Sequence, residues 1–166
     1  MDSQAAVQSP DTKRQMLRHS VATLAYRGGK AMRGASAGFA EYRASEGGRT
    51  PGQILAHLGD LLEWALSMSQ GKQKWNDSPA LSWDAGTERF FRGLEALDAY
   101  LASEAPLHVS PEKLFQGPVA DALTHVGQIS MLRRMAGEAV RGENFYVADI
   151  AAGRVGSEQA APVREF

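Results

Sequence analysis

The segment Thr50–Gly71, TPGQILAHLGDLLEWALSMSQG, contains the clearest helix signal in the chain. Thr50 is followed by Pro51 and then, three residues after the threonine, by Gln53, an arrangement that satisfies the free amide groups at a helix start. Apolar side chains then recur at the spacing of one helical face, namely Ile54, Leu58, Leu61, Ala65 and Met68. We therefore predict an amphipathic helix that begins at Pro51 and ends near Gly71.

Three further segments have the same helical period. The first runs from about Pro10 to about Ala44, and two of its glycines fall on the apolar stripe, where a missing side chain lets a neighbouring helix approach. The third helix is predicted to start near a Ser82 cap, with apolar residues on one side at Phe90, Phe91, Leu94, Leu97 and Leu101. The fourth is predicted from about Pro118 to Ala136, with Gly137 placed to end it.

Four amphipathic helices without a convincing strand between them favour one architecture, because each apolar stripe has to be buried against another. The sequence predicts an all-α fold, an antiparallel up-down four-helix bundle that forms a single domain over residues 1–166. The glycine-rich segment from about 138 to 166 has no sustained period and is predicted to be an irregular tail across the bundle. We expect Phe145, Tyr146 and Ile150 to anchor that tail.

Composition limits the kinds of site that the chain can build. The 166 residues include no cysteine, so a metal site must use imidazole, carboxylate or water, and the candidate nitrogen ligands are His19, His57, His108 and His125. The formal net charge of −1 gives no long-range field that would attract nucleic acid or an acidic membrane. The amino-terminal residues lack a basic region and an apolar run suited to export. We therefore expect a cytoplasmic protein without nucleic-acid or membrane partners.

Two polar side chains on the fourth predicted helix stand one turn apart, Asp121 and His125. Residues four apart on a helix project in nearly the same direction, so both can reach one ion. His57 lies at the edge of the apolar stripe of the second helix and can approach from there. Two imidazoles and one carboxylate leave coordination positions open, a pattern that suits zinc, nickel, iron or manganese without choosing among them.

The same residues also permit a structural interpretation. A histidine at the edge of an apolar stripe is often a hydrogen-bonded packing residue, and Asp121 can favour the positive amino-terminal end of its helix. His19 has no acidic or imidazole partner at helical spacing, and His108 lies in a loop bounded by prolines. We expect His19 and His108 to be solvated and not to bind metal.

The run THVGQISMLRR, with His125, Gly127, Gln128 and Arg133, resembles the signature of the DinB-like family of four-helix metalloproteins. The resemblance extends to His57 in ILAHLGDLLEW, where the family places its first ligand, and to the closing NFYVADIAAGRVGSEQAAPVREF, so it covers essentially the whole chain. It implies a metal site made by His57, Asp121 and His125. The family usually has a third histidine at the position of Asp121, and an aspartate there would change metal affinity and preference.

The resemblance also implies how the ligands are held and what the site does. We expect a partner for the free ring nitrogen of each histidine, with Asp60 or Glu63 as candidates beside His57. Some family members are similar to thiol-dependent transferases and isomerases and others to metal-dependent hydrolases, so a thiol or another anionic small molecule is the expected substrate.

Two alternatives to a metalloenzyme stay open from the sequence. One is a non-catalytic metal-binding or stress-response protein, and the other is a metal-free bundle whose function is oligomerisation. For the metalloenzyme and for both alternatives we expect a homodimer, since such bundles commonly pair through exposed apolar faces. The candidates for the interface are Trp64, Trp75 and Trp83.

Overall fold

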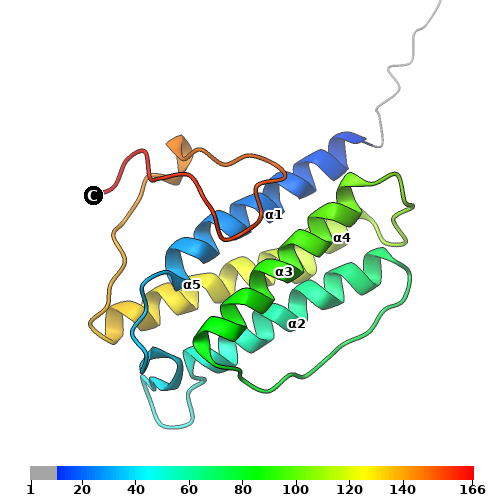
Figure 1. Ribbon diagram of the computed structural model, residues 1–166. Coiled ribbons are helices and arrows are strands. Elements are labelled where there is room, and N and C mark those ends of the chain that lie inside the picture. Colours follow the sequence, from blue (N-terminus) through cyan, green and yellow to red (C-terminus); the bar gives the residue numbers. More distant parts are fainter. Residues whose placement is uncertain (1–10) are drawn as a thin grey trace, which may run out of the picture.

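The computed structural model describes residues 11–166, and within this range four long helices pack into one all-α bundle, as predicted (Figure 1). The long helices are α1 (Asp11–Met32), α2 (Pro51–Ser69), α3 (Trp83–Ala102) and α5 (Ala120–Met135). Short helical turns connect them or follow them, η1 (Phe39–Glu41), α4 (Pro111–Leu114), η2 (Phe115–Val119) and η3 (Phe145–Val147). None of the described helices is both long enough and apolar enough to cross a membrane.

The packing order of the helices differs from their order along the chain. Both α1 and α2 contact α3 and α5, so α1 and α2 lie diagonally opposite each other. The residues that pack these helices together are apolar and almost fully buried, with Val21, Leu24, Leu58, Phe90, Leu94 and Ile129 at the centre. The seam between α2 and α5 is the part of this arrangement that positions the candidate site.

Strict up-down alternation, which we predicted, is wrong for α2 and α3. A Cβ added to Gly86 would lie 2.8 Å from Leu55, and one added to Gly93 would lie 2.9 Å from Leu62, so contacts advance in the same direction along both helices. The two helices are therefore parallel, and residues 70–82 return along the length of the bundle to join them (Figure 1). The two glycines let the backbone of α3 approach side chains of α2 closely. The parallel direction itself depends on the long connection between the two helices, because a short turn would make them antiparallel.

The first long helix ends at Met32 and not near Ala44 as predicted, and Pro10, its predicted start, lies outside the described residues. Gly34 has a φ of 69°, a left-handed conformation that ends the helix at little cost for glycine. The Arg133 guanidinium of α5, which is 5% exposed, donates to the carbonyls of Ala31, Arg33 and Gly34 at 3.2, 2.6 and 3.1 Å. This buried arginine thereby satisfies the free carbonyls at the end of α1.

The predicted caps of α2 and α3 are confirmed. Thr50 and Gln53 exchange hydrogen bonds between side chain and backbone at the start of α2, and the Ser82 hydroxyl accepts from the amide of Ala85 at the start of α3. The chain leaves α2 after Ser69 through Gly71, whose φ is 71°. These starts depend on interactions within one turn, which explains why the sequence predicts them well.

The predicted start of the last helix, Pro118, is wrong. Helical structure already begins at Pro111, because the Ser110 hydroxyl caps the amide of Lys113. Pro118 lies in the π-helical segment η2, where the wider turn accommodates a residue without an amide hydrogen. The predicted end is close to that observed, since α5 ends at Met135 and Gly137 has a φ of 81°.

The carboxy-terminal segment is irregular and crosses α1, in agreement with the prediction (Figure 1). Phe145 packs edge-on against Tyr26, with ring centroids 6.2 Å apart, and Ile150 is packed against the core, so both act as anchors. Tyr146 is 95% exposed, and its predicted role as an anchor is wrong. Val155, 5% exposed, is an apolar anchor of the tail that the sequence analysis missed.

Candidate metal centre

His57, Asp121 and His125 come together where α2 packs against α5, and each offers a ligand atom within 4.8 Å of the other two. His57 Nε2 lies 3.5 Å from one Asp121 carboxylate oxygen, and His125 Nδ1 lies 3.3 Å from the other. The two imidazole rings lie 4.6 Å apart between centroids. The three predicted site residues therefore form one cluster that can hold a metal ion.

The spacing within the cluster is too long for charge-assisted hydrogen bonds and suits ligands of a common ion. A charge-assisted N–H to carboxylate bond is about 2.7–2.9 Å long. Two ligands about 2.1 Å from a tetrahedral ion lie about 3.4 Å apart. The separation of 3.5 Å between His57 Nε2 and Asp121 matches the second arrangement. The 3.3 Å separation at His125 is measured from Nδ1, which faces the helix backbone, so His125 would bind an ion through its other ring nitrogen.

The orientation of His125 is set by its own helix. Its Nδ1 lies 2.8 Å from the backbone carbonyl of Asp121, one turn earlier. A hydrogen on Nδ1 makes this contact a donor–acceptor pair and leaves the lone pair of the imidazole on Nε2. A backbone carbonyl commonly holds a metal-binding histidine in this way. The i, i+4 spacing thus places the Asp121 carboxylate beside His125 and also orients the His125 ring so that its Nε2 lone pair is free to bind an ion.

The cluster lies at the surface of the bundle on one side and is enclosed on the other. The side chain of Asp121 is 46% exposed, that of His57 22% and that of His125 10%. The loop between α2 and α3 covers part of the site, since Trp75 packs edge-on against His57 with centroids 5.6 Å apart, and against Trp64 at the same distance. An ion held here would therefore have an open side near Asp121.

Asp60 and Glu63 do not support His57 as we expected. Asp60 accepts from Arg89 at 2.7 Å and from the Ser78 hydroxyl and amide at 2.6 and 2.9 Å. Glu63 accepts from Arg89 at 2.9 Å and from Asn76 at 2.9 Å. Both carboxylates therefore fix the position of the 70–82 loop and of α3, and the prediction that one of them orients the imidazole is wrong.

The ionisation of these two carboxyl groups follows from their contacts. Burial opposes the charge on Asp60, but the hydrogen bonds from Arg89 and Ser78 outweigh it and lower its pKa. The hydrogen bond from Arg89 is the largest influence on Glu63 and lowers the pKa of that group as well. The two carboxylates and Arg89 thus form a charged network, whose member Asp60 lies one turn after His57 on α2.

Neither of the other two histidines joins a cluster of ligands in the described residues. His19 and His108 are both exposed, as predicted. The ring of His108 lies beside Gly71, and its backbone amide donates to the Ser69 carbonyl at 3.1 Å. These two residues provide controls for experiments on His57 and His125.

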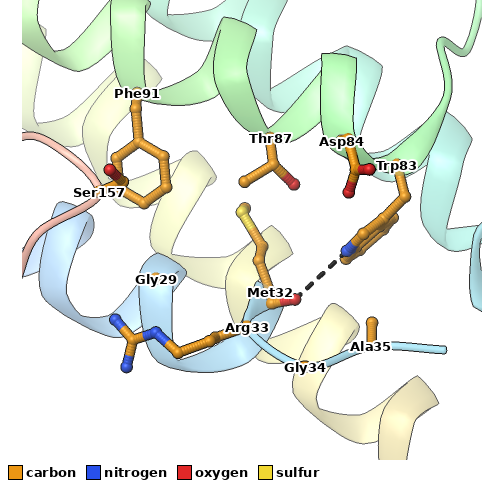
Figure 2. A pocket seen from close by; sticks show the side chains of 10 residues that line it. All are labelled: Gly29, Met32, Arg33, Gly34, Ala35, Trp83, Asp84, Thr87, Phe91 and Ser157. Atoms are coloured by element: carbon orange, nitrogen blue, oxygen red, sulfur yellow. Dashed lines mark hydrogen bonds between the residues drawn. The ribbon is translucent and has the colours of Figure 1, made fainter.

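A different hollow, of about 230 Å³, lies between the end of α1 and the start of α3 (Figure 2). Its walls include Met32, Trp83 and Phe91, and the indole nitrogen of Trp83 donates to the Met32 carbonyl at 3.2 Å. Asp84 is the one carboxylate among its lining residues and no histidine is among them, so the hollow does not offer the several ligands that a metal centre needs. Trp83 also packs edge-on against Phe39, which makes it a structural residue of the bundle.

The sequence analysis missed the residues that surround the metal cluster. A hollow of about 370 Å³ beside His57 is lined by Arg49 and Gln53 and by residues 77–80. The residues 77–80 belong to the loop that joins the parallel helices, so their place beside His57 depends on the helix directions. Gln53 lies one turn before His57 on α2, and that spacing is the signal that could have identified it.

Comparison of the chain with protein families, curated proteins and solved structures finds no match in any of the three.

Proposed function

We propose that the protein binds one divalent metal ion through His57, Asp121 and His125 and uses it in catalysis. The observation that carries this proposal is the open triangle of ligand atoms at the seam of α2 and α5. Zinc or nickel is the expected ion, because imidazole and carboxylate ligands suit both, and iron or manganese would also accept this ligand set.

The proposed class is a metal-dependent hydrolase or a thiol-dependent transferase. When bound, the ion would supply a Lewis acid that activates water or holds an anionic substrate group at its open positions. Asp121 would lower the net charge of the centre and, at 46% exposure, would stand beside its solvent-facing side. The 70–82 loop would exclude water from the other side through the packing of Trp75 on His57.

Membership of the DinB-like family is part of this proposal. Support comes from the two histidines on separate helices that face each other, and from the Gly127–Gln128 pair that follows His125. Asp121 occupies the position where that family usually has a histidine. A homodimer remains a prediction, and Trp75, which is 47% exposed, is the tryptophan best placed for such an interface.

The proposal is tested by loading protein that has never contacted a nickel column with cobalt and recording the visible absorption. His57→Ala and His125→Ala should each abolish stoichiometric binding, because each removes one of three protein ligands. Asp121→His should preserve or strengthen the binding of nickel, copper or zinc, and Asp121→Asn should weaken binding.

The matched control is His108→Ala, which removes an exposed imidazole outside the cluster and should leave cobalt binding unchanged. Equal cobalt binding by the wild type and by His57→Ala would show that the metal is not held at this site. A panel of hydrolase and thiol-transfer substrates then separates an enzyme from a protein that only binds metal.

A further inference from the structure

Arg49 lies directly before the cap of α2 and is exposed. Among the described residues, its guanidinium takes part in no ion pair and no hydrogen bond, in contrast to Arg89 and Arg133, whose contacts hold helices together. Arg49 lines two hollows, each of about 370 Å³, and so forms a wall common to both. An unpaired guanidinium between two hollows is available to bind an anionic group.

The first hollow is polar and is lined by one of the candidate metal ligands. Its lining residues include His57 and Gln53. Asp60 also lines it, but Arg89 and Ser78 already occupy its carboxylate oxygens. Asp77 is exposed and has no partner among the described residues, so its charge disfavours a second anion inside this hollow. A negative group is therefore more stable at Arg49 than beside residues 77–80.

The second hollow is mainly apolar. It lies between the segment before α2 and the last turns of α5, with Ile54, Met131 and Leu132 in its wall. Met131 is 54% exposed there, although an exposed side chain of this size leaves apolar surface in contact with water. Gln128, one turn after the ligand His125 on α5, provides a polar group in the same hollow.

We propose that the site accepts an amphipathic carboxylate. Its negative charge would pair with Arg49, its apolar part would occupy the hollow at Ile54, Met131 and Leu132, and its reacting group would extend to His57 through the polar hollow. A guanidinium can bind a carboxylate through two parallel hydrogen bonds, which fixes the orientation of the ligand. The inference rests on the proposed function, because the reacting group would meet the metal.

The test uses octanoate as the probe and isothermal titration calorimetry of the full-length protein, with and without cobalt. Octanoate should bind at least tenfold more tightly than acetate, because it adds apolar carbon that the second hollow can bury. It should also bind more tightly than octanol, which lacks the charge. Arg49→Gln should weaken octanoate binding about tenfold, the loss expected for a hydrogen-bonded charge pair, and Arg49→Lys should restore part of it.

Two variants complete the design. Asp77→Asn should strengthen octanoate binding about twofold, because it removes the unpaired negative charge from the first hollow. Arg164→Gln is the matched control, since Arg164 is an exposed arginine of the tail that lines neither hollow. It should bind octanoate as the wild type does.

The outcomes separate this inference from the proposed function. Equal octanoate affinity in the wild type and in Arg49→Gln, or equal affinity for octanoate and acetate, overturns the inference even when cobalt binds. Octanoate binding that depends on Arg49 in a protein that fails to take up cobalt supports the anion site and refutes the metal site. Arg49→Gln should leave cobalt affinity itself unchanged.

Discussion

Two carboxylates of this protein, Glu143 and Asp121, each have two side-chain partners but differ in burial and in the distances to those partners. The side chain of Glu143 is fully buried, and its oxygens accept from the Tyr26 hydroxyl at 2.6 Å and the Lys30 ammonium at 2.7 Å. Asp121 is 46% exposed, and its nearest nitrogen partners, on His57 and His125, stand 3.5 and 3.3 Å away. The first carboxylate is saturated and the second retains free lone pairs.

The difference shows which cluster has its hydrogen bonds completed within the protein and which could still hold an ion. Glu143 and Glu165, paired across an isolated bridge, both bind Lys30 and so fasten the tail to α1. Burial and the hydrogen bond to Glu143 raise the pKa of Tyr26 to about 12, so this hydroxyl remains a donor at neutral pH. Groups whose hydrogen bonds are complete have no capacity for a ligand, whereas Asp121 and its histidines do.

The largest effect on stability is expected from removing Glu143, whose carboxylate binds both Tyr26 and Lys30. Glu143→Ala should lower the free energy of unfolding by about 3 kcal/mol, because it leaves Tyr26 and part of the Lys30 charge without a buried partner. Urea denaturation measures this change. Cobalt binding per folded molecule should be unaffected, and a loss of binding would show that the two clusters are coupled.

Removal of the metal should have a smaller effect on stability. That effect should depend on the cluster of His57, Asp121 and His125. An ion present at about 100 times its dissociation constant stabilises the folded state by about 2.7 kcal/mol. For a chain of this size, a chelator should therefore lower the melting temperature by about 5–10 °C. His57→Ala should melt at the same temperature with and without chelator, and a chelator effect in that variant would place the ion elsewhere.

The smallest expected change in stability concerns Asp60 and Glu63, the two carboxylates that pair with Arg89. The pKa values of Asp60 and Glu63 are lowered in the folded protein, so their contribution to stability is present above the pKa of the unfolded chain, near pH 4. It is lost as the pH falls through the lower folded values. Urea denaturation from pH 7 to pH 3 should show this loss.

Asp60→Asn provides the comparison for that experiment. It removes one of the two titrating groups and should flatten the acid limb of the stability profile. An unchanged profile would mean that the contacts of Asp60 with Arg89 and Ser78 do not favour its charged form.

Much of the secondary structure follows from interactions within one helical turn. The cap of α2 at Thr50, the cap of α3 at Ser82 and the end of α5 before Gly137 are confirmed, because each depends on neighbouring residues. The predicted end of α1 is wrong for two reasons: the local break at Gly34 does not stand out from the other glycines of the segment, and the Arg133 side chain that satisfies the last carbonyls lies about a hundred residues further along the chain. Periodicity alone cannot locate such a partner.

The four amphipathic segments and the Asp121–His125 pair can be predicted from the residues alone, since both follow from the geometry of a single helix. The folded bundle was needed to show that α2 runs parallel to α3, that Trp75 packs against His57 and that Arg49 lines two hollows. The same holds for the ion pairs of Glu143 and Glu165 with Lys30 of α1, and for those of Asp60 and Glu63 with Arg89. These results depend on which surfaces meet when the chain packs, and the free energy of that packing is shared among residues far apart in the sequence.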